Sequence, residues 1–226
     1  MKPGSILLAA LAAWAAATIG AAAEDKVKVG LIVTLSGPAA VLGGQVRDGF
    51  NLAVKTLDGK LGGLDAEVIV VGDELKPDVA VTKVKGLLER DQVNFVVGPV
   101  FSNVLMAIHK PVTESNAFLI SPNAGTSNFA GKQCNPNFFV TSYQNDQIHE
   151  VLGKYAQDKG YNSAFLLAPN YQAGKDAIAG FKHDFKGKIV DEDYTPLGQL
   201  DFSPSSPRSP PTNRKRSSPS CRAAWA

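Results

Sequence analysis

Short apolar runs alternate with segments of helical period along most of this chain, and this alternation restricts the possible folds more than any other feature. The apolar runs predict strands at 27–35, 66–71, 94–100, 117–121, 163–168 and 188–193. The segments between them carry apolar residues three or four positions apart and predict helices at 45–57, 76–90, 103–114, 146–159 and 174–185, the third interrupted or ended near Pro111. Strands that alternate with helices form parallel sheets covered by helices on both faces. The sequence therefore predicts an α/β fold with Rossmann-like parallel sheets.

The predicted elements fall into two series. Four strands with three helical crossovers come first, followed by a loop at 122–137 that is rich in Asn, Gly, Ser and Pro. The second series begins with the helix at 146. We place the boundary near 142–145, so that residues 24–143 form lobe I and residues 144–203 form part of a lobe II.

The first 23 residues have the three parts of a secretory signal peptide. Lys2 supplies the positive start, residues 6–19 form the apolar run, and Ala21–Ala23 provide small residues at the cleavage point. The apolar run is shorter than the ~20 residues that a membrane-spanning helix needs. We predict cleavage after Ala23 and export of the mature chain.

Residues 204–226, PSSPRSPPTNRKRSSPSCRAAWA, have no hydrophobic period and contain no acidic residue. A basic, disordered arm that binds nucleic acid or an anionic surface is one interpretation, but an exported protein has little use for such an arm. We interpret the tail as out of frame. If one base were lost after the codon of Ser203, the neighbouring frame permits AELAQIAADQPEAVFAFLPGGMG, among other readings that codon degeneracy allows. This helix followed by a strand would resume the alternating pattern.

The formal net charge of +2 does not describe the body of the chain. Of the 23 basic residues, five lie in the tail and Lys2 lies in the signal peptide, which leaves 17 basic against 21 acidic residues and a net charge of −4. Such a balance does not favour a nucleic-acid partner.

The loops that follow the strands hold the candidate site, because ligands of open α/β sheets bind beyond the carboxyl ends of the strands. Residues 26–54 join a strand to a Gly/Pro loop and a helix, and such a junction directs free backbone N–H groups toward an anionic group. Ser102 follows the third strand, and its hydroxyl can donate a hydrogen bond to a carboxylate. Residues 123–126 follow the fourth strand. A loop residue that only caps its own turn or helix is the alternative for each.

The chain carries, in order after the signal peptide, KVGLIVTLSGPAAVLGGQVRDGFNLAV, VNFVVGPVFS, AFLISPNAGTS and APNYQAGKDAIAGF. In this order and spacing, residues 26–203 resemble the periplasmic solute-binding proteins of ABC importers, in the Leu/Ile/Val-binding (type I) family. The resemblance implies two α/β lobes, joined by a hinge, that close on an amino acid or a related small molecule in the periplasm. It also implies docking on an ABC permease in the inner membrane, and no cofactor.

The resemblance also implies the ligand contacts. They are Ser102, which holds the ligand carboxylate, the adjoining main chain of Asn123, Ala124 and Gly125, and Tyr171 from lobe II. Leu42 stands where relatives place an aromatic side chain against the ligand, which implies a ligand of a different shape. Branched-chain amino acids, amides and small aromatic carboxylates are all compatible with these loops.

Members of this family are much longer and return to both lobes after the point where the tail begins. The second lobe is therefore expected to be incomplete, and the group that meets the ammonium of an amino-acid ligand is missing. Lobe I also lacks elements, which leaves exposed edges prone to aggregation. We predict that the 226-residue product is unstable or inactive.

An enzyme is the alternative to a binding protein. Tyr171 and Lys175 have the Y-x-x-x-K spacing that, in short-chain dehydrogenases, lets the lysine lower the pKa of the tyrosine from the same helix face. The glycine-rich fingerprint of a dinucleotide site is missing, since GPAAVLGG does not match G-x-G-x-x-G. His109, His149 and His183 lie far apart without the spacing of metal ligands. We therefore predict no catalytic residues and no metal site.

Overall fold

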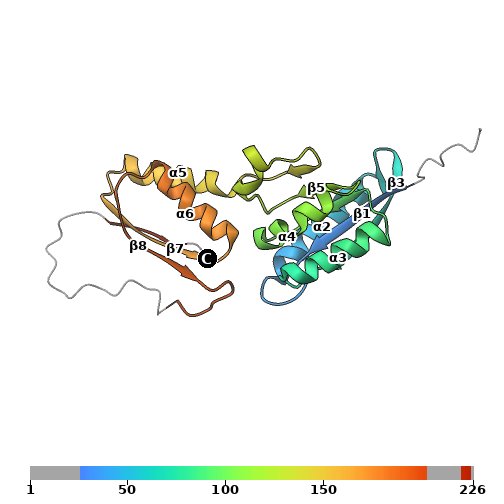
Figure 1. Ribbon diagram of the computed structural model, residues 1–226, viewed down its shortest axis with the longest axis horizontal. Coiled ribbons are helices and arrows are strands. Elements are labelled where there is room, and N and C mark those ends of the chain that lie inside the picture. Colours follow the sequence, from blue (N-terminus) through green and yellow to red (C-terminus); the bar gives the residue numbers. More distant parts are fainter. Residues whose placement is uncertain (1–25, 203–219, 225–226) are drawn as a thin grey trace, which may run out of the picture.

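The computed structural model describes residues 26–202 and 220–224, so the predicted signal peptide and most of the tail lie outside the described residues. The chain forms two α/β lobes, placed one after the other along the long axis of the molecule (Figure 1). Each lobe has its own sheet. In the part of the chain that the structure describes, no helix is both long and apolar enough to cross a membrane.

Lobe I is built on a six-stranded sheet with the order β2-β3-β1-β4-β5-β6. Its strands are β1 (Lys26–Val33), β2 (Lys60–Leu61), β3 (Leu64–Gly72), β4 (Phe95–Val97), β5 (Phe118–Ser121) and β6 (Phe138–Val140). Neighbouring strands pair in parallel, except for β2 and β3, which form an antiparallel hairpin. The parallel strands place their carboxyl ends at one edge of the sheet, which is where the candidate site was predicted.

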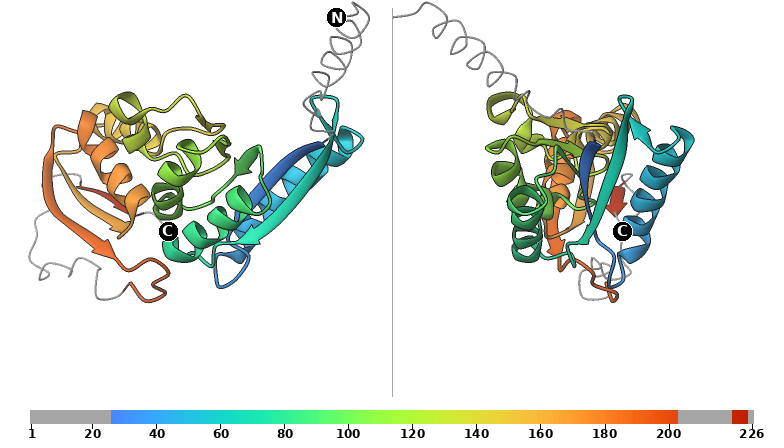
Figure 2. Two further views of the ribbon diagram at one scale, coloured as in Figure 1. Left: turned by 45° about the vertical axis from the view of Figure 1, so that its right-hand side comes forward. Right: turned by 90° about the vertical axis from the view of Figure 1, so that its right-hand side faces the viewer.

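Helices α3 (Pro77–Glu89) and α4 (Ser102–Thr113) cover one face of this sheet, and α2 (Ala40–Thr56) covers part of the other (Figure 2). Successive side chains of β1 point to opposite faces. Ile32 joins the core under α3 and α4, while Leu31 and Val33 join the core under α2. Residues 29–33 of the strand are therefore buried on both faces, as their uninterrupted apolar sequence requires.

Apart from shifts of one to three residues at the ends of elements, lobe I differs from the predicted elements in three places. Helix α2 begins at Ala40 rather than at residue 45. Pro111 lies inside α4 and does not end it, because Ile108 and Val112 are buried in the core and hold the last turn in place. The sequence does not predict β2 or β6, whose two and three residues are too few to show a period.

Lobe II contains a three-stranded sheet with the order β8-β7-β9, together with helices α5 (Asn145–Asp158) and α6 (Gln172–Asp184). Strands β7 (Ser163–Pro169) and β8 (Lys188–Thr195) pair in parallel, as predicted. The core residues of this lobe are Ala156, Ala164, Leu166, Ala168, Ile178, Phe181 and Phe185. The predicted α/β class with parallel sheets in two lobes is confirmed.

Strand β9 (Ser220–Ala224) pairs in parallel with β7, so that Ser220 lies opposite Ser163 and Ala224 opposite Leu167. The sequence did not predict a strand here, because the tail has no hydrophobic period, yet these residues pair with β7. The physical reason is the free edge of β7, whose main-chain N–H and C=O groups can pair with another strand whatever its side chains. The reading frame of the tail stays a prediction.

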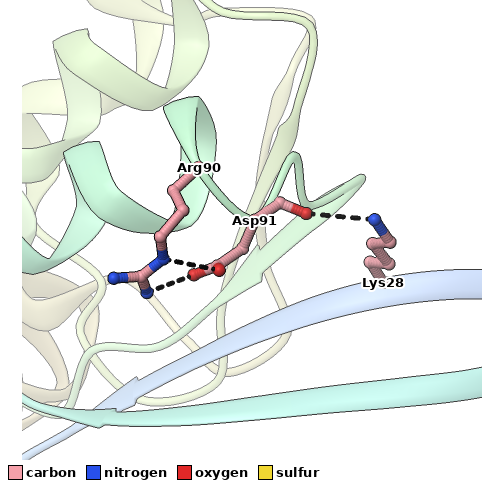
Figure 3. A network of polar contacts seen from close by, with 3 residues as sticks. All are labelled: Lys28, Arg90 and Asp91. Carbon is pink, nitrogen blue, oxygen red and sulfur yellow. Dashed lines mark hydrogen bonds and ion pairs between the residues drawn. The ribbon is translucent and has the colours of Figure 1, made fainter.

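A polar contact ties the turn after α3 to β1 (Figure 3). Arg90 donates from Nε and Nη2 to the two carboxylate oxygens of Asp91, at 2.8 and 2.7 Å. Lys28 Nζ donates to the main-chain oxygen of Asp91 at 3.3 Å. The hydrogen bond from Arg90 lowers the pKa of Asp91. Because the Arg90 side chain is 76% exposed, this contact orients the turn and adds little stability.

Candidate functional site

Ser102 is the first residue of α4, in the segment that follows the carboxyl end of β4. It is buried, with 2% of its surface exposed. Phe101 precedes it in an extended conformation and leads the chain into the helix. The leading N–H groups of a helix have no partners within the helix and carry partial positive charge. Ser102 thus combines a hydroxyl group with a helix N-terminus, an arrangement that suits an anionic ligand group.

Asn145 joins the two lobes at this point. Its side-chain Nδ2 donates to Ser102 Oγ in lobe I at 3.1 Å and to Asp176 Oδ2 in lobe II at 2.9 Å. Its main-chain N–H donates to the carbonyl oxygen of Gly125 at 2.7 Å. Gln172 Nε2 donates to the other carboxylate oxygen of Asp176 at 2.8 Å. These contacts form a continuous polar network from α6 through α5 to the start of α4.

The sequence did not single out Asn145 or Asp176. The bonds of Asn145 reach across 43 residues to Ser102 and 31 residues to Asp176, so no local pattern indicates them. The only available signal was position, because Asn145 ends the predicted lobe boundary at 142–145.

The segment of Asn123, Ala124 and Gly125 is held tightly beside the same network. Asn123 Nδ2 donates to the carbonyl oxygen of Val100 at 2.7 Å, which joins the loops after β5 and β4. Ser121 Oγ donates to the carbonyl oxygen of Ala124 at 2.6 Å. A Cβ atom on Gly125 would lie 2.2 Å from the carbonyl oxygen of Tyr143, so only glycine fits this close approach of the chain to itself.

Tyr171 approaches the site from lobe II. Its ring lies 6.2 Å from that of Phe101, the residue before Ser102. Burial, and to a smaller extent the negative charge of Asp176, raise the pKa of the Tyr171 hydroxyl. The structure therefore brings together all five residues that the resemblance assigned to the ligand: Ser102, Asn123, Ala124, Gly125 and Tyr171.

The arrangement does not fit the enzyme alternative. Tyr171 precedes α6 in an extended conformation (φ −149°, ψ 179°) instead of lying on the helix with Lys175. Lys175 is exposed, whereas Tyr171 is partly buried. A dehydrogenase of this type needs a tyrosine with a lowered pKa, but the pKa of Tyr171 is raised.

A cavity of about 230 Å³ lies beside this cluster, lined by Leu42, Gln45, Val46, Val100 and Asn123. Leu42 and Asn123 therefore face a common space between α2 and the loops after β4 and β5. A larger hollow, of about 700 Å³, lies at the opposite edge of lobe I, where its lining includes Asn94 before β4 and Ala117 before β5. It is at the amino ends of the strands, so it does not occupy the position in which α/β sheets bind ligands.

The histidines lie apart in the structure as well. His109 stacks on Phe129, His149 Nδ1 contacts the carbonyl oxygen of Asn145 at 2.7 Å, and His183 lies beside Asp184. Among the residues whose placement is described, no three His, Cys, Asp or Glu side chains are grouped as metal ligands would be.

Two α/β lobes with a polar network at their junction are the architecture of two-lobed solute-binding proteins. The chain belongs to the periplasmic binding protein family, whose family model matches residues 26–207. Proteins of this family bind the substrates of ABC transporters and are not enzymes. The resemblance inferred from the sequence is thereby confirmed.

Among curated proteins, the chain is 31% identical over 204 residues to Leu/Ile/Val-binding protein homolog 6 of Brucella abortus, covering 88% of this chain and 51% of that protein. Among solved structures, it is 32% identical to an ABC-transporter solute-binding protein of R. palustris in complex with benzoate, with a TM-score of 0.75 and coverage of 80% of this chain and 51% of that one. A related protein of Rhodopseudomonas palustris BisB5, in complex with 3,4-dihydroxybenzoic acid, is 31% identical with a TM-score of 0.74, covering 80% and 50%. The chain thus spans about half the length of the relatives that it matches.

Proposed function

We propose that this chain is an extracytoplasmic solute-binding component of an ABC importer. It holds a small carboxylate between its two lobes, with the carboxylate at Ser102, and delivers it to a permease in the inner membrane. The location is the periplasm, which the predicted signal peptide supports. Family membership supports the transport role.

The observation that carries this proposal is the buried Ser102 at the N-terminus of α4, bonded to Asn145 at the junction of the lobes. A serine that only capped its own helix would not need a partner in the other lobe. A hydroxyl group and the N–H groups of a first helical turn together provide several donors for one carboxylate. Binding needs no cofactor.

Both the site and the relatives support this ligand class. Benzoate and 3,4-dihydroxybenzoic acid, the ligands of two solved relatives, are small aromatic carboxylates, and the curated relatives are named for leucine, isoleucine and valine. All these compounds share the carboxylate. Leu42 leaves an aliphatic wall at the cavity beside the site, which suits an apolar ligand body.

Binding experiments on the 226-residue chain separate this function from the enzyme alternative. We expect benzoate or isoleucine to cause chemical-shift changes at Ser102 and residues 123–125 in NMR titrations, and we expect NAD and NADP to cause none. Shift changes with the dinucleotides alone would instead favour an oxidoreductase that uses Tyr171 and Lys175. Absence of binding by every carboxylate tested would contradict the proposed function for this chain and would agree with the expectation from the sequence that the 226-residue product is inactive.

A further inference from the structure

We propose that Asn145 is a positioning residue that fixes the Ser102 hydroxyl as a hydrogen-bond donor to the ligand, and that Asp176 sets the orientation of Asn145. This inference rests on the proposed function of the same site. It assigns roles to two residues that do not themselves hold the ligand.

The orientation of the Asn145 amide follows from its two neighbours. A side-chain amide has a nitrogen that only donates and an oxygen that only accepts. Asp176 Oδ2 lies 2.9 Å from Asn145 Nδ2. Rotating the amide by half a turn would place its oxygen against this carboxylate oxygen, which would replace a hydrogen bond by a repulsion. Asp176 is 4% exposed, so water cannot readily relieve that repulsion.

The position of Asp176 is itself fixed. Gln172 Nε2 donates to Oδ1 and Asn145 Nδ2 donates to Oδ2, so both carboxylate oxygens act as acceptors. The donor and acceptor of each hydrogen bond in the network are therefore fixed. Asp176 holds the Asn145 amide, and the remaining hydrogen of that amide points at Ser102 Oγ at 3.1 Å.

The hydrogen bond from Asn145 determines whether the Ser102 hydroxyl group donates or accepts toward the ligand. A hydroxyl group has one hydrogen to donate and two lone pairs that accept. Because Ser102 Oγ accepts from Asn145, its own hydrogen turns away from Nδ2 and is donated to another group. The site therefore offers the ligand a donor and prefers an acceptor, above all a carboxylate, to an uncharged group of the same shape. The main-chain N–H of Asn145 also donates to the carbonyl oxygen of Gly125 in lobe I. Asn145 therefore links the preference of Ser102 for a carboxylate to the arrangement of the two lobes.

The test compares benzoate with benzamide, an uncharged probe of nearly the same shape, in NMR titrations of the 226-residue chain. We expect Asn145→Ala to lower the benzoate-to-benzamide affinity ratio by about threefold to tenfold, the effect of one hydrogen bond. Asn145→Asp lowers the ratio further, because the new carboxylate accepts the Ser102 hydrogen and repels benzoate. Asn116→Ala, an exposed asparagine at the far edge of lobe I, leaves the ratio unchanged.

Asp176→Asn provides a second variant that leaves both Asn145 and Ser102 in place. An amide at position 176 accepts either orientation of Asn145, so Ser102→Ala should lower the benzoate-to-benzamide affinity ratio less in the Asp176→Asn chain than in the wild-type chain. This comparison cancels the gain in benzoate affinity that the loss of the Asp176 charge causes. If thermal unfolding shows that Asn145→Ala does not fold, Asp176→Asn tests whether Asn145 positions the Ser102 hydroxyl group. An unchanged ratio in the folded Asn145 variants, or an equal effect of Ser102→Ala in the Asp176→Asn and wild-type chains, with benzoate still bound by the wild-type chain, would overturn the positioning role alone. A wild-type chain that binds neither probe nor any other carboxylate would overturn the proposed function and this inference with it.

Discussion

At the scale of single residues, His109 shows how burial sets a charge state. Its ring stacks on Phe129 at 3.7 Å between centroids and meets Phe138 edge-on at 5.0 Å. The residue is 8% exposed. Burial among these rings lowers the pKa of His109 below its ordinary value of about 6.5. The histidine is therefore neutral in the folded chain at neutral pH.

This lowered pKa predicts a loss of stability in mild acid. Below about pH 6.5 the unfolded chain binds a proton at His109 that the folded chain does not yet bind, so the free energy of unfolding decreases as the pH falls toward the lowered pKa. His109 contributes at most about 1.4 kcal/mol per pH unit in this window. Urea unfolding between pH 7.5 and 5 measures how the free energy of unfolding changes with pH. The slope should become shallower in His109→Phe and stay the same in Asn116→Ala, which replaces an exposed residue without a charge; equal slopes in all three chains would contradict the prediction.

At the scale of secondary-structure elements, two adjacent glycines of α2 have different roles. A Cβ atom on Gly43 would lie 1.8 Å from the main-chain oxygen of Thr34, at the end of β1, whereas a Cβ atom on Gly44 would meet no atom within 4 Å. Gly43 therefore permits the helix to approach the strand. Gly44 has no such role and only lowers the helix propensity.

These neighbours predict opposite effects of the same substitution. Gly43→Ala forces the start of α2 away from β1 and should destabilise the chain by about 2 kcal/mol or more, the range for overpacking at a buried contact. Gly44→Ala should stabilise it by up to about 1 kcal/mol. Denaturant unfolding of the two variants measures both changes, with each acting as the control for the other. Destabilisation of similar size in both would show that α2 does not approach β1 as described.

A comparison of the predicted and observed elements shows how much of the fold the sequence alone predicts. Periodicity predicted the long strands and helices because each buries an extended apolar stripe. It missed the start of α2, because Gly43 and Gly44 resembled a loop. It also missed β2, β6 and β9, whose short sequences show no period.

The residues of the candidate site were predictable from the sequence to the same extent. Position after a strand indicated Ser102 and residues 123–125, and the resemblance supplied Tyr171. The network of Asn145 and Asp176 depends on contacts between distant segments, which local sequence does not encode.

At the scale of the whole molecule, no element within residues 26–202 and 220–224 covers one part of the lobe I sheet. An almost wholly apolar groove of about 340 Å³ runs between α2 and the strands and is lined by Val27, Val29, Phe50, Leu61, Gly62, Phe95, Val97 and Ile120. Phe139 on the adjoining β6 is 51% exposed. Apolar surface of this kind usually lies under another element or a partner. It supports the expectation that this chain alone is less stable than the relatives of which it spans about half.

The tail gives a prediction at the same scale. We propose that residues 204–226 are read out of frame, so resequencing the gene across the codons of Ser203 and Pro204 should recover one base. The restored frame should encode a helix and a strand in place of the basic segment. The same uninterrupted reading frame in independent isolates would refute this.

The central claim is that the chain holds a ligand carboxylate at Ser102, and a benzoate titration of the wild-type chain and Ser102→Ala, followed by NMR, tests it most directly. We predict that the wild-type chain binds benzoate with a Kd of about 1 mM, because the resemblance assigns Tyr171 alone from lobe II to the ligand. Ser102→Ala should bind about tenfold more weakly, the effect of one charge-assisted hydrogen bond. Ser115→Ala, beyond the other end of α4, should bind like the wild type. Equal benzoate affinity in all three folded chains would contradict the account.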